Sequence, residues 1–523
     1  MQDLKDQNDY IDLFFNERWT NYALDNSDEI PNLLLELEKE THQKIIQPRM
    51  MSSPLQGRLL SFISNILRPK KILEIGCSSG KDAISLNGGA NTLFGASDTK
   101  VINISGGFNN VASGIGIDVI NIAGGNNTVF SEGSNDSIVV LGGVNRVFTG
   151  QGNDLVTIGG SATFEVLDGG AGDDSILVSP GSGFTIPAAV NFERYLVQKS
   201  VHQSLDFSQS LNISEVKLQG GTTIDGDTIT ITVGAGQTLV LDGLTDGDTG
   251  AALLSDGGIA IAQDNSVTAV GVTLMDVGPA TSIANENIFI DIAGTGTANL
   301  TVTSGNDSFV VFSNSGGALT GLELLGTGTM ALGTLPNSIT NVNGSAASAN
   351  LTLTIGSGAS NTIKGGIGDD AITLSGGVND VDLGDGDDTL TTSSNLVAGD
   401  RIDGGNGTDT LEVIHTGLAT IPSTANLTSI ERVTIQDTVH QTLDFSALTS
   451  ITGIELDSGT TVDGATITTT IGANQELTLD SITDGDTAAA SLADGGIKIA
   501  QANSITSIDL IIDDIGPASA NAN

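Results

Sequence analysis

The chain is poor in the features that hold most proteins of its size together. Cys77 is the only cysteine in 523 residues, so no disulfide can form within the chain and any stapling must come from something else. Aromatic residues make up only 4% of the sequence. High charge with few aromatic residues is typical of disordered chains. Here β-branched residues recur regularly, which favours an ordered structure instead.

Neither a signal peptide nor a membrane span is expected from the sequence. The N-terminal stretch MQDLKDQNDYIDLFF has no basic region followed by a long apolar core, so a Sec-type signal peptide is not expected. No stretch approaches 18 uninterrupted apolar residues, so no membrane span is expected either.

Basic residues are scarce and unevenly placed. The chain has 19 Lys and Arg against 62 Asp and Glu, a formal net charge of −43. Residues 1–86 hold 10 of the basic and 13 of the acidic residues, so nearly all of the acidic excess lies in residues 87–523. Such an excess repels itself unless cations bind, and it argues against nucleic acid as a partner. By composition the sequence therefore divides into two different regions, residues 1–86 and residues 87–523.

Residues 1–86 have the pattern of helices followed by one strand. Leu33, Leu34 and Leu37 lie near helical spacing, and LQGRLLSFISNIL gives a second amphipathic pattern. The run KKILEIG then predicts a short buried strand that ends in a glycine turn. A strand, a glycine turn and a new helix form a common ligand cradle, because glycine lets backbone N–H groups approach a ligand.

This segment resembles the N-terminal portion of small-molecule O-methyltransferases of the catechol and caffeoyl-CoA type. The resemblance implies an S-adenosylmethionine site at Glu74, Gly76 and Gly80. Lys81 stands where the family has an aromatic residue, and the later strands that carry the ribose, metal and substrate contacts do not follow. We therefore expect a truncated remnant without activity. The alternative is a cytoplasmic S-adenosylmethionine-dependent O-methyltransferase fused to a repeat region.

From Leu86 onward the sequence repeats every 18 residues. Gly-Gly pairs begin at positions 88, 106, 124 and 142, and Asp118, Asp136 and Asp154 have the same spacing. Eighteen residues are two nonapeptides, and a fixed short period predicts a solenoid. Three nonapeptides fit the pattern G-G-x-G-x-D-x-(apolar)-x without error: GGAGDDSIL, GGIGDDAIT and GGNGTDTLE.

These nonapeptides resemble the calcium-binding repeats-in-toxin family, which forms a parallel β-roll. The resemblance implies Ca²⁺ as the cofactor, held by the aspartates of the full and the worn copies of the motif. The candidate ligands are Asp118, Asp136, Asp154, Asp173, Asp174, Asp307, Asp369, Asp370, Asp387, Asp388 and Asp409.

The residue types account for such a site without the family name. Glycine adopts the positive φ that a tight turn needs, and the aspartate supplies a hard carboxylate oxygen, with turn carbonyls completing a six-oxygen shell. The strand after each aspartate alternates, so Ile120 and Ile138 are expected to point inward. Plain turns without a ligand remain the alternative, because Gly-Asp also makes ordinary hairpin turns.

The other half of each coil has no aspartate. GGFNNV, GGNNTV and GGVNRV place valine in its position, and asparagine can hold the left-handed turn conformation without a metal. We therefore expect Asp118, Asp136 and Asp154 to stack on one edge, one coil apart, and Asn/Gly turns to form the opposite edge.

A longer repeat sets the domain organisation. VHQSLDFSQS, which begins at position 201, returns as VHQTLDFSAL at position 439. The repeated module alternates apolar and polar residues, which fits either a β-sandwich or further solenoid coils. The expected parts are the methyltransferase-like segment 1–86, a first calcium β-roll 87–190, a β-rich module 191–280, a β-rich lead-in with a second roll 281–427, and a second module copy 428–523.

The patterns together predict a mainly β protein, in which parallel β-roll or solenoid blocks alternate with β-rich modules. A small α-rich segment with one Rossmann-like strand precedes them. The repeat part is similar to surface-layer proteins and large adhesins built from calcium-binding repeats. That similarity implies a non-catalytic structural or adhesive protein, outside the cell or at its surface after signal-peptide-independent export. Its expected partners are further copies of the chain or a cell-surface glycan or protein.

Overall fold

The described part of the chain consists of β-strands and their connections. In the computed structural model no helix occurs among the described residues. The described residues are 82–513, apart from 96, 180–184, 199–203, 211, 221–222, 225–227, 247–257, 264–266, 279–287, 358–359, 393–395, 398, 415–425, 437–441, 458–460, 463–465, 481–482, 485–495 and 502–506.

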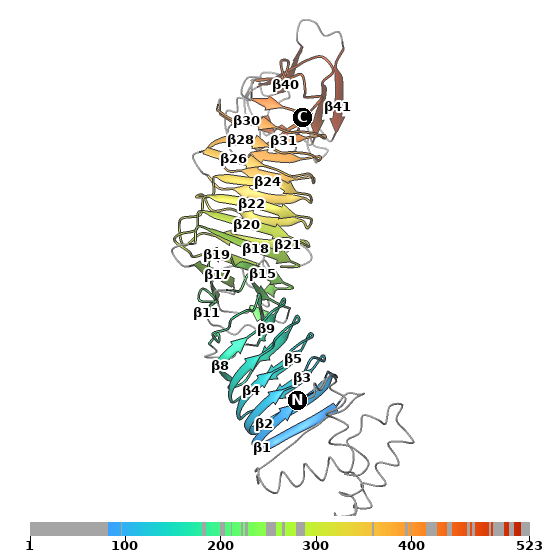
Figure 1. The fold of residues 1–523 in the computed structure, drawn as a ribbon. Coiled ribbons are helices and arrows are strands. Elements are labelled where there is room, and N and C mark those ends of the chain that lie inside the picture. The colour runs from blue at the N-terminus through green and yellow to red at the C-terminus, as the bar shows by residue number, and fades with distance from the viewer. Residues whose placement is uncertain are drawn as a thin grey trace, which may run out of the picture. The chain divides into compact units, whose positions relative to one another are not determined.

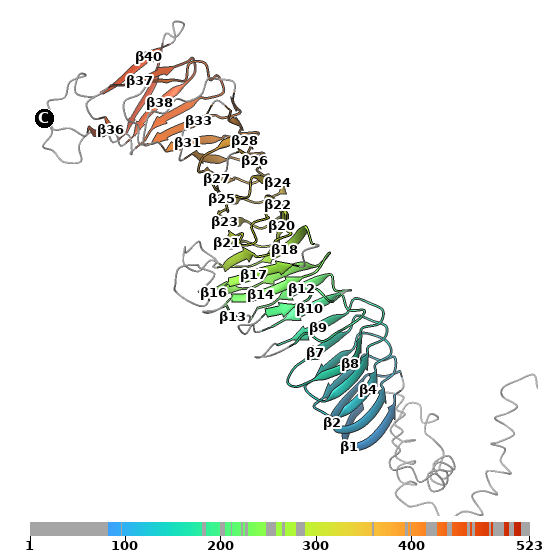
Figure 2. The same cartoon turned by 90° about the vertical axis from the view of Figure 1, so that its left-hand side faces the viewer.

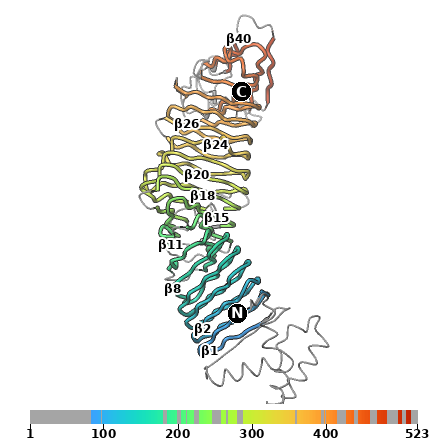
Figure 3. Tube along the Cα trace, viewed as in Figure 1, coloured from blue at the N-terminus to red at the C-terminus, as the bar shows by residue number. Residues whose placement is uncertain are grey.

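The chain divides into two compact units, and each is a parallel β-solenoid. The first unit holds the described residues through Asp154 together with Gly160–Val166, and the second holds Leu155–Gly159 and the residues from Leu167 onward. The coils number about 15. Figure 1 shows the strands as stacked rungs, and Figure 3 traces the same coils along the backbone. The predicted mainly β solenoid is therefore confirmed.

Each coil of the first unit has two strand segments, which form two layers. The first segment of β2 pairs in parallel with β3, and its second segment pairs with β4. β5 and β6 extend the first and the second layer by one more coil. The blue and teal strands in Figure 2 are the stacked coils of this part of the chain. The strands are β1 (Asp82–Phe94), β2 (Lys100–Ala112), β3 (Val119–Ile122), β4 (Asn126–Phe130), β5 (Ser137–Val140), β6 (Val144–Phe148) and β8 (Thr163–Asp168).

A thin aliphatic core runs between the two layers of the first unit. Ile102, Ile120 and Ile138 lie one coil apart and are 0% exposed, so the prediction that Ile120 and Ile138 point inward is confirmed. Alternate residues of each strand face inward because the side-chain period of a strand is two. Each fully buried isoleucine contributes about 1.5–3 kcal/mol relative to an exposed one.

The second unit continues the same architecture in two parallel stacks. One stack contains β7 (Leu155–Ile158), β9 (Ser175–Val178), β10 (Arg194–Val197), β12 (Glu215–Leu218), β15 (Thr238–Asp242), β18 (Ala269–Met275), β20 (Asn299–Ser304), β22 (Gly321–Gly326), β24 (Asn341–Ala347), β26 (Ser360–Lys364), β28 (Val378–Asp382), β30 (Arg401–Asp403) and β32 (Leu427–Thr428). The other contains β11 (Ser204–Asp206), β14 (Thr228–Val233), β17 (Gly258–Gln263), β19 (Ile288–Ile292), β21 (Ser308–Ser313), β23 (Met330–Thr334), β25 (Leu351–Ile355), β27 (Ala371–Leu374), β29 (Thr389–Thr392), β31 (Thr410–Ile414), β33 (Arg432–Gln436), β35 (Gly453–Leu456), β38 (Glu476–Asp480) and β41 (Asp509–Asp513).

The β-rich modules are further solenoid coils rather than a sandwich. In the first copy β12 pairs in parallel with β15 and β15 with β18. In the second copy β33, β35 and β38 pair in the same way. Short parallel groups flank them: β13 (Thr223–Ile224) with β16 (Thr245–Asp246), β36 (Thr461–Val462) with β39 (Thr483–Asp484), and β34 (Thr442–Asp444) with β37 (Thr466–Ile471) and β40 (Gly496–Gln501).

A buried glutamine shows that the long sequence repeat is also a structural repeat. The Gln237 side chain accepts a hydrogen bond from the Gly234 N–H at 2.8 Å and donates to the Phe207 carbonyl at 3.0 Å. Gln475 makes the equivalent bonds, with the Gly472 N–H at 2.6 Å from its side-chain oxygen. Each glutamine therefore ties two backbone segments together at the same place in its module.

Residues 1–81 of the methyltransferase-like segment lie outside the described residues, and with them Glu74, Gly76 and Gly80. The first described strand, β1, begins at Asp82, and Asp82 pairs with Lys100 of the next coil. The coil pattern thus extends five residues to the N-terminal side of the boundary expected at residue 87.

Candidate metal sites in the aspartate ladders

The aspartates of the 18-residue repeat form a ladder along one edge of the first unit. The backbone N–H of Asp118 donates a hydrogen bond to Oδ1 of Asp136 at 2.7 Å, and the backbone N–H of Asp136 donates to Oδ1 of Asp154 at 2.7 Å. We call Asp118, Asp136 and Asp154 the first ladder. Their stacking one coil apart was predicted and is confirmed.

The carboxylates of this ladder point into the protein. Asp118 is 0% exposed and Asp136 is 2% exposed. In both residues Oδ2 is buried and has no hydrogen-bond partner of good geometry, although the hydroxyl of Ser113 lowers the pKa of Asp118 and that of Ser131 lowers the pKa of Asp136. A buried charged oxygen without a partner costs free energy. These two carboxyl groups therefore require either a cation or a proton.

The pKa values of the first ladder are raised, which also favours a proton or a cation at these carboxyl groups. The pKa of Asp136 is raised from 3.8 to about 7. Burial is the main cause, the hydrogen bonds from the Asp118 backbone and the Ser131 hydroxyl oppose it, and the neighbouring carboxylates of Asp154 and Asp118 add a smaller increase. Burial also raises the pKa of Asp118 and that of Asp154. At neutral pH a proton therefore competes with any cation for this ladder.

Lys100 occupies the ladder position one coil before Asp118. It is 1% exposed, its backbone N–H donates to Oδ1 of Asp118 at 2.7 Å, and its Nζ donates to the Asp98 carbonyl at 2.6 Å. Its charge lowers the pKa of Asp118, against the larger effect of burial. Lys100 was not among the predicted site residues, although it lies 18 residues before Asp118 and therefore at the equivalent position of the preceding coil.

A second ladder lies in the second unit and consists of Asp370, Asp388 and Asp409. The backbone N–H of Asp370 donates to Oδ1 of Asp388 at 2.7 Å, and that of Asp388 donates to Oδ1 of Asp409 at 3.0 Å. All three side chains are buried. Burial raises the pKa of Asp370 to about 6 and that of Asp388 to about 7. The second ladder therefore repeats the arrangement of the first, except that Oδ2 of Asp370 accepts a hydrogen bond from the Gly366 N–H at 2.8 Å.

A glutamate follows the last aspartate of each roll. The Asp174 backbone N–H donates to Oε2 of Glu193 at 2.7 Å, and the Asp409 backbone N–H donates to Oε2 of Glu431 at 2.9 Å. The two glutamates are equivalent positions of the 238-residue repeat. They were not among the predicted site residues, because neither belongs to a glycine-rich nonapeptide.

The remaining predicted ligands lie outside the buried ladders. Asp369 and Asp387 are exposed, and the Asp387 N–H donates to Oδ1 of Asp369 at 2.9 Å. Asp173 pairs with Arg194 at 2.5 Å. Asp307 is exposed, and the buried Ser308 takes the inward position beside it. These four carboxylates lie outside the buried ladders, although the charge of Asp369 raises the pKa of Asp370 and the charge of Asp387 raises the pKa of Asp409.

The first glycine of the full motif leaves room for the aspartate. A Cβ atom at Gly365 would lie 2.6 Å from Oδ2 of Asp370, and one at Gly404 would lie 2.5 Å from Oδ2 of Asp409. Neither approach is possible without displacing the carboxylate. The second glycine serves the turn, as at Gly405, where φ is 97°. The motif thus combines a cradle for the carboxylate with a left-handed turn.

The carboxylate oxygens of the ladders are ligands that suit a hard cation, but the side chains alone do not complete its coordination shell. Within the described residues no group of three or more His, Cys, Asp or Glu side chains is arranged to hold a metal ion. Each coil supplies one buried carboxylate, so backbone carbonyls or water would have to provide further oxygens. The partnerless Oδ2 atoms of Asp118, Asp136 and Asp388 are the observation that favours a cation.

The opposite edge of the first unit carries an asparagine ladder. Nδ2 of Asn109 donates to Oδ1 of Asn127 at 2.6 Å, and Nδ2 of Asn127 donates to Oδ1 of Asn145 at 2.8 Å. The prediction that asparagine holds the left-handed conformation was wrong, because Gly107 and Gly125 take it, with φ of 90° and 94°. The asparagines instead satisfy one another through amide groups that both donate and accept.

Comparison with known proteins does not place the chain in a family. No protein-family model matches it, and no curated protein matches it. Among the described residues no helix is long and apolar enough to cross a membrane.

Proposed function

We propose that the chain is a non-catalytic, calcium-stabilised repeat protein with a structural or adhesive role outside the cell, of the surface-layer or adhesin type. The observation that carries this proposal is the pair of buried carboxylate ladders, in which Oδ2 of Asp118, Asp136, Asp388 and Asp409 has no hydrogen-bond partner of good geometry within the described structure. A long parallel solenoid with such ladders is a scaffold whose stability a cation can control.

In this proposal Ca²⁺ neutralises the ladders. The residues that would hold it are Asp118, Asp136, Asp154 and Asp174 in the first roll, and Asp370, Asp388 and Asp409 in the second. Bound calcium would replace the cross-links that a chain with one cysteine lacks. It would also offset the acidic excess of residues 87–523, which otherwise opposes compaction.

An extracellular setting suits this chemistry. Calcium sites of extracellular modules have dissociation constants of about 10⁻⁴–10⁻³ M, so the proposed sites need only weak affinity there. Location at the cell surface is suggested by the similarity to surface-layer and adhesin proteins and belongs to the same proposal.

The test compares the full chain with and without calcium. Circular dichroism, hydrodynamic radius and melting temperature are measured in EDTA, in Ca²⁺ and in Mg²⁺ at equal ionic strength. We expect Ca²⁺ alone to increase the β signal, compact the chain and raise the melting temperature. The proposal fails if none of the three quantities differs between EDTA and Ca²⁺.

A further inference from the structure

The outer surface of the second layer in the first unit carries three rows of side chains in register. One row is Ala90, Phe108, Asn126 and Val144; the next is Thr92, Asn110, Thr128 and Arg146; the third is Phe94, Ala112, Phe130 and Phe148. Members of one row lie on adjacent strands, about 4.8 Å apart. The surface therefore presents a polar row between two rows that contain aromatic rings.

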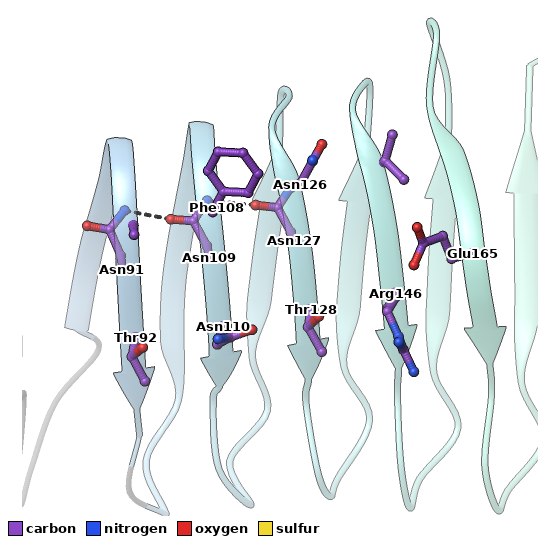
Figure 4. Close-up of a pocket in the computed structure, with 12 residues that line it drawn as sticks. Asn91, Thr92, Phe108, Asn109, Asn110, Asn126, Asn127, Thr128, Arg146 and Glu165 are labelled. Atoms are coloured by element: carbon purple, nitrogen blue, oxygen red, sulfur yellow. Dashed lines mark hydrogen bonds between the residues drawn. The ribbon is translucent and has the colours of Figure 1, made fainter.

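The first two rows line a groove of about 480 Å³, which we call the outer groove. Figure 4 shows Asn110, Thr128 and Arg146 along it, with Phe108 at one side and Glu165 at the far end. Amide and hydroxyl groups both donate and accept hydrogen bonds. The outer groove thus presents, on β1, β2 and β4, a side chain that can both donate and accept hydrogen bonds: Thr92, Asn110 and Thr128.

Aromatic rings are exposed beside this polar row. Phe108 is 66% exposed and Phe94 is 69% exposed. Phe130 stacks on Phe148 with ring centroids 4.8 Å apart and an interplanar angle of 9°. In a chain with few aromatic residues, phenylalanines therefore flank the polar row on both sides, with Phe108 on one side and Phe94, Phe130 and Phe148 on the other.

The outer groove is electrically balanced. Its lining contains one cation, Arg146, and one anion, Glu165. Residues 87–523 as a whole carry a large acidic excess, which repels polyanions such as nucleic acid. The charge therefore favours an uncharged ligand.

The floor beneath the groove is held in place. The inward neighbours of the outer rows are Asn109, Asn127 and Asn145, which are linked by their amide ladder and anchored to the glycine corners, for example Asn127 Nδ2 to the Gly124 carbonyl at 3.1 Å. Because the strand spacing is fixed, the outer side chains are preorganised, which lowers the entropy cost of binding.

We propose that the outer groove binds an uncharged, linear polysaccharide that lies along the solenoid axis. A sugar ring with its glycosidic oxygen is comparable in length to one coil spacing, so successive sugars meet successive coils. Their hydroxyls hydrogen-bond to the row of Asn110, Thr128 and Arg146, and their C–H faces pack on Phe108 and its neighbours. This site is separate from the aspartate ladders, and it adds an adhesive surface to the proposed scaffold.

The experiment is affinity electrophoresis of the full chain through gels that contain one polysaccharide each. The probes are hydroxyethyl cellulose, mixed-linkage glucan, mannan and dextran, with heparin as the polyanion. We expect at least one neutral polysaccharide to retard the protein and heparin not to. Phe108→Ala and the double variant Asn110→Ala/Thr128→Ala should each weaken that retardation at least tenfold.

The matched control is Ile115→Ala, which removes an apolar side chain of similar exposure, 61%, from outside the groove of the same unit. It should bind as the parent chain does, and circular dichroism should show that all variants fold. The inference is wrong if no neutral polysaccharide binds, if heparin alone binds, or if the groove variants bind unchanged. It is also wrong if Phe108→Ala instead changes the oligomeric state, which would identify the face as a contact between copies. A calcium response that persists without glycan binding would refute this inference alone.

Discussion

The substitution Asp136→Asn separates a calcium ladder from a plain turn, because its effect should change sign with calcium. Asparagine keeps the shape of the side chain and the Oδ1 atom that accepts the Asp118 N–H. It removes the buried charge. Without calcium, the substitution removes the free-energy cost of burying a charged carboxylate. With calcium, it would remove one of the proposed Ca²⁺ ligands.

The magnitude follows from the pKa of Asp136, which burial raises from 3.8 to about 7. Between these two values the unfolded chain releases its proton while the folded chain keeps it, so stability falls as pH rises from about 4 to 7 and is constant above. A shift of about 3 units corresponds to roughly 4 kcal/mol at 1.36 kcal/mol per unit. A buried amide N–H without an acceptor costs about 1–3 kcal/mol. The variant should therefore be more stable than the parent by about 1–3 kcal/mol at pH 8 in EDTA.

This difference in stability is measured locally by amide hydrogen exchange of peptides covering residues 119–148, detected by mass spectrometry. Parent and variant are compared at pH 5 and pH 8 in EDTA, and at pH 8 in saturating Ca²⁺. In EDTA at pH 8 the variant should exchange about 5- to 160-fold more slowly, at 1.36 kcal/mol per tenfold change, with a smaller or opposite difference at pH 5. In Ca²⁺ it should exchange faster than the parent.

Asp382→Asn is the control, because Asp382 is an exposed strand residue that loses the same charge. It should leave exchange in residues 119–148 unchanged under every condition. If Asp136→Asn destabilises the first unit equally with and without calcium, the buried carboxylate has only a structural hydrogen-bonding role and the reasoning is refuted.

Three further predictions concern other parts of the chain. The double variant Asp370→Asn/Asp388→Asn should raise the calcium concentration that protects residues 360–413 from hydrogen exchange, while the first unit responds as before; a shift of both units together would contradict independent ladders. Gln237→Ala should cost about 2 kcal/mol, because it leaves a buried N–H and buried carbonyls unpaired, and local exchange in residues 204–242 should rise without a change in the second module. The full chain should transfer no radiolabelled methyl group from S-adenosylmethionine to a catechol, and activity that Gly76→Val abolishes would overturn this expectation.

The repetitive features were readable from the sequence because a solenoid is nearly one-dimensional. Asp118, Asp136 and Asp154 had to stack once the period of 18 equalled one coil, and the alternation around Ile120 and Ile138 set the inward face. The same logic did not distinguish a sandwich from further coils in the modules, because alternation is identical in both and only the parallel pairing of β12 with β15 decides.

Departures from the motif needed the tertiary structure. Lys100 and Glu431 belong to the ladder register without belonging to the nonapeptide pattern, and hydrogen bonds between coils reveal them. The asparagine edge was assigned to turns, because local propensity favours that conformation for asparagine, whereas the amides of Asn109 and Asn127 pair across coils.

Some properties of the sites could be predicted from the sequence, and others depend on the tertiary structure. Local sequence established which residues carry carboxylates and which glycines can turn, since both depend on residue type and spacing alone. Burial of the Asp136 and Asp388 carboxylates, with the resulting rise in pKa, depends on what the neighbouring coils cover. The alignment of Asn110, Thr128 and Arg146 on one outer face likewise exists only after the coils stack, because these residues come from three successive coils, β2, β4 and β6, that hydrogen-bonded register brings together.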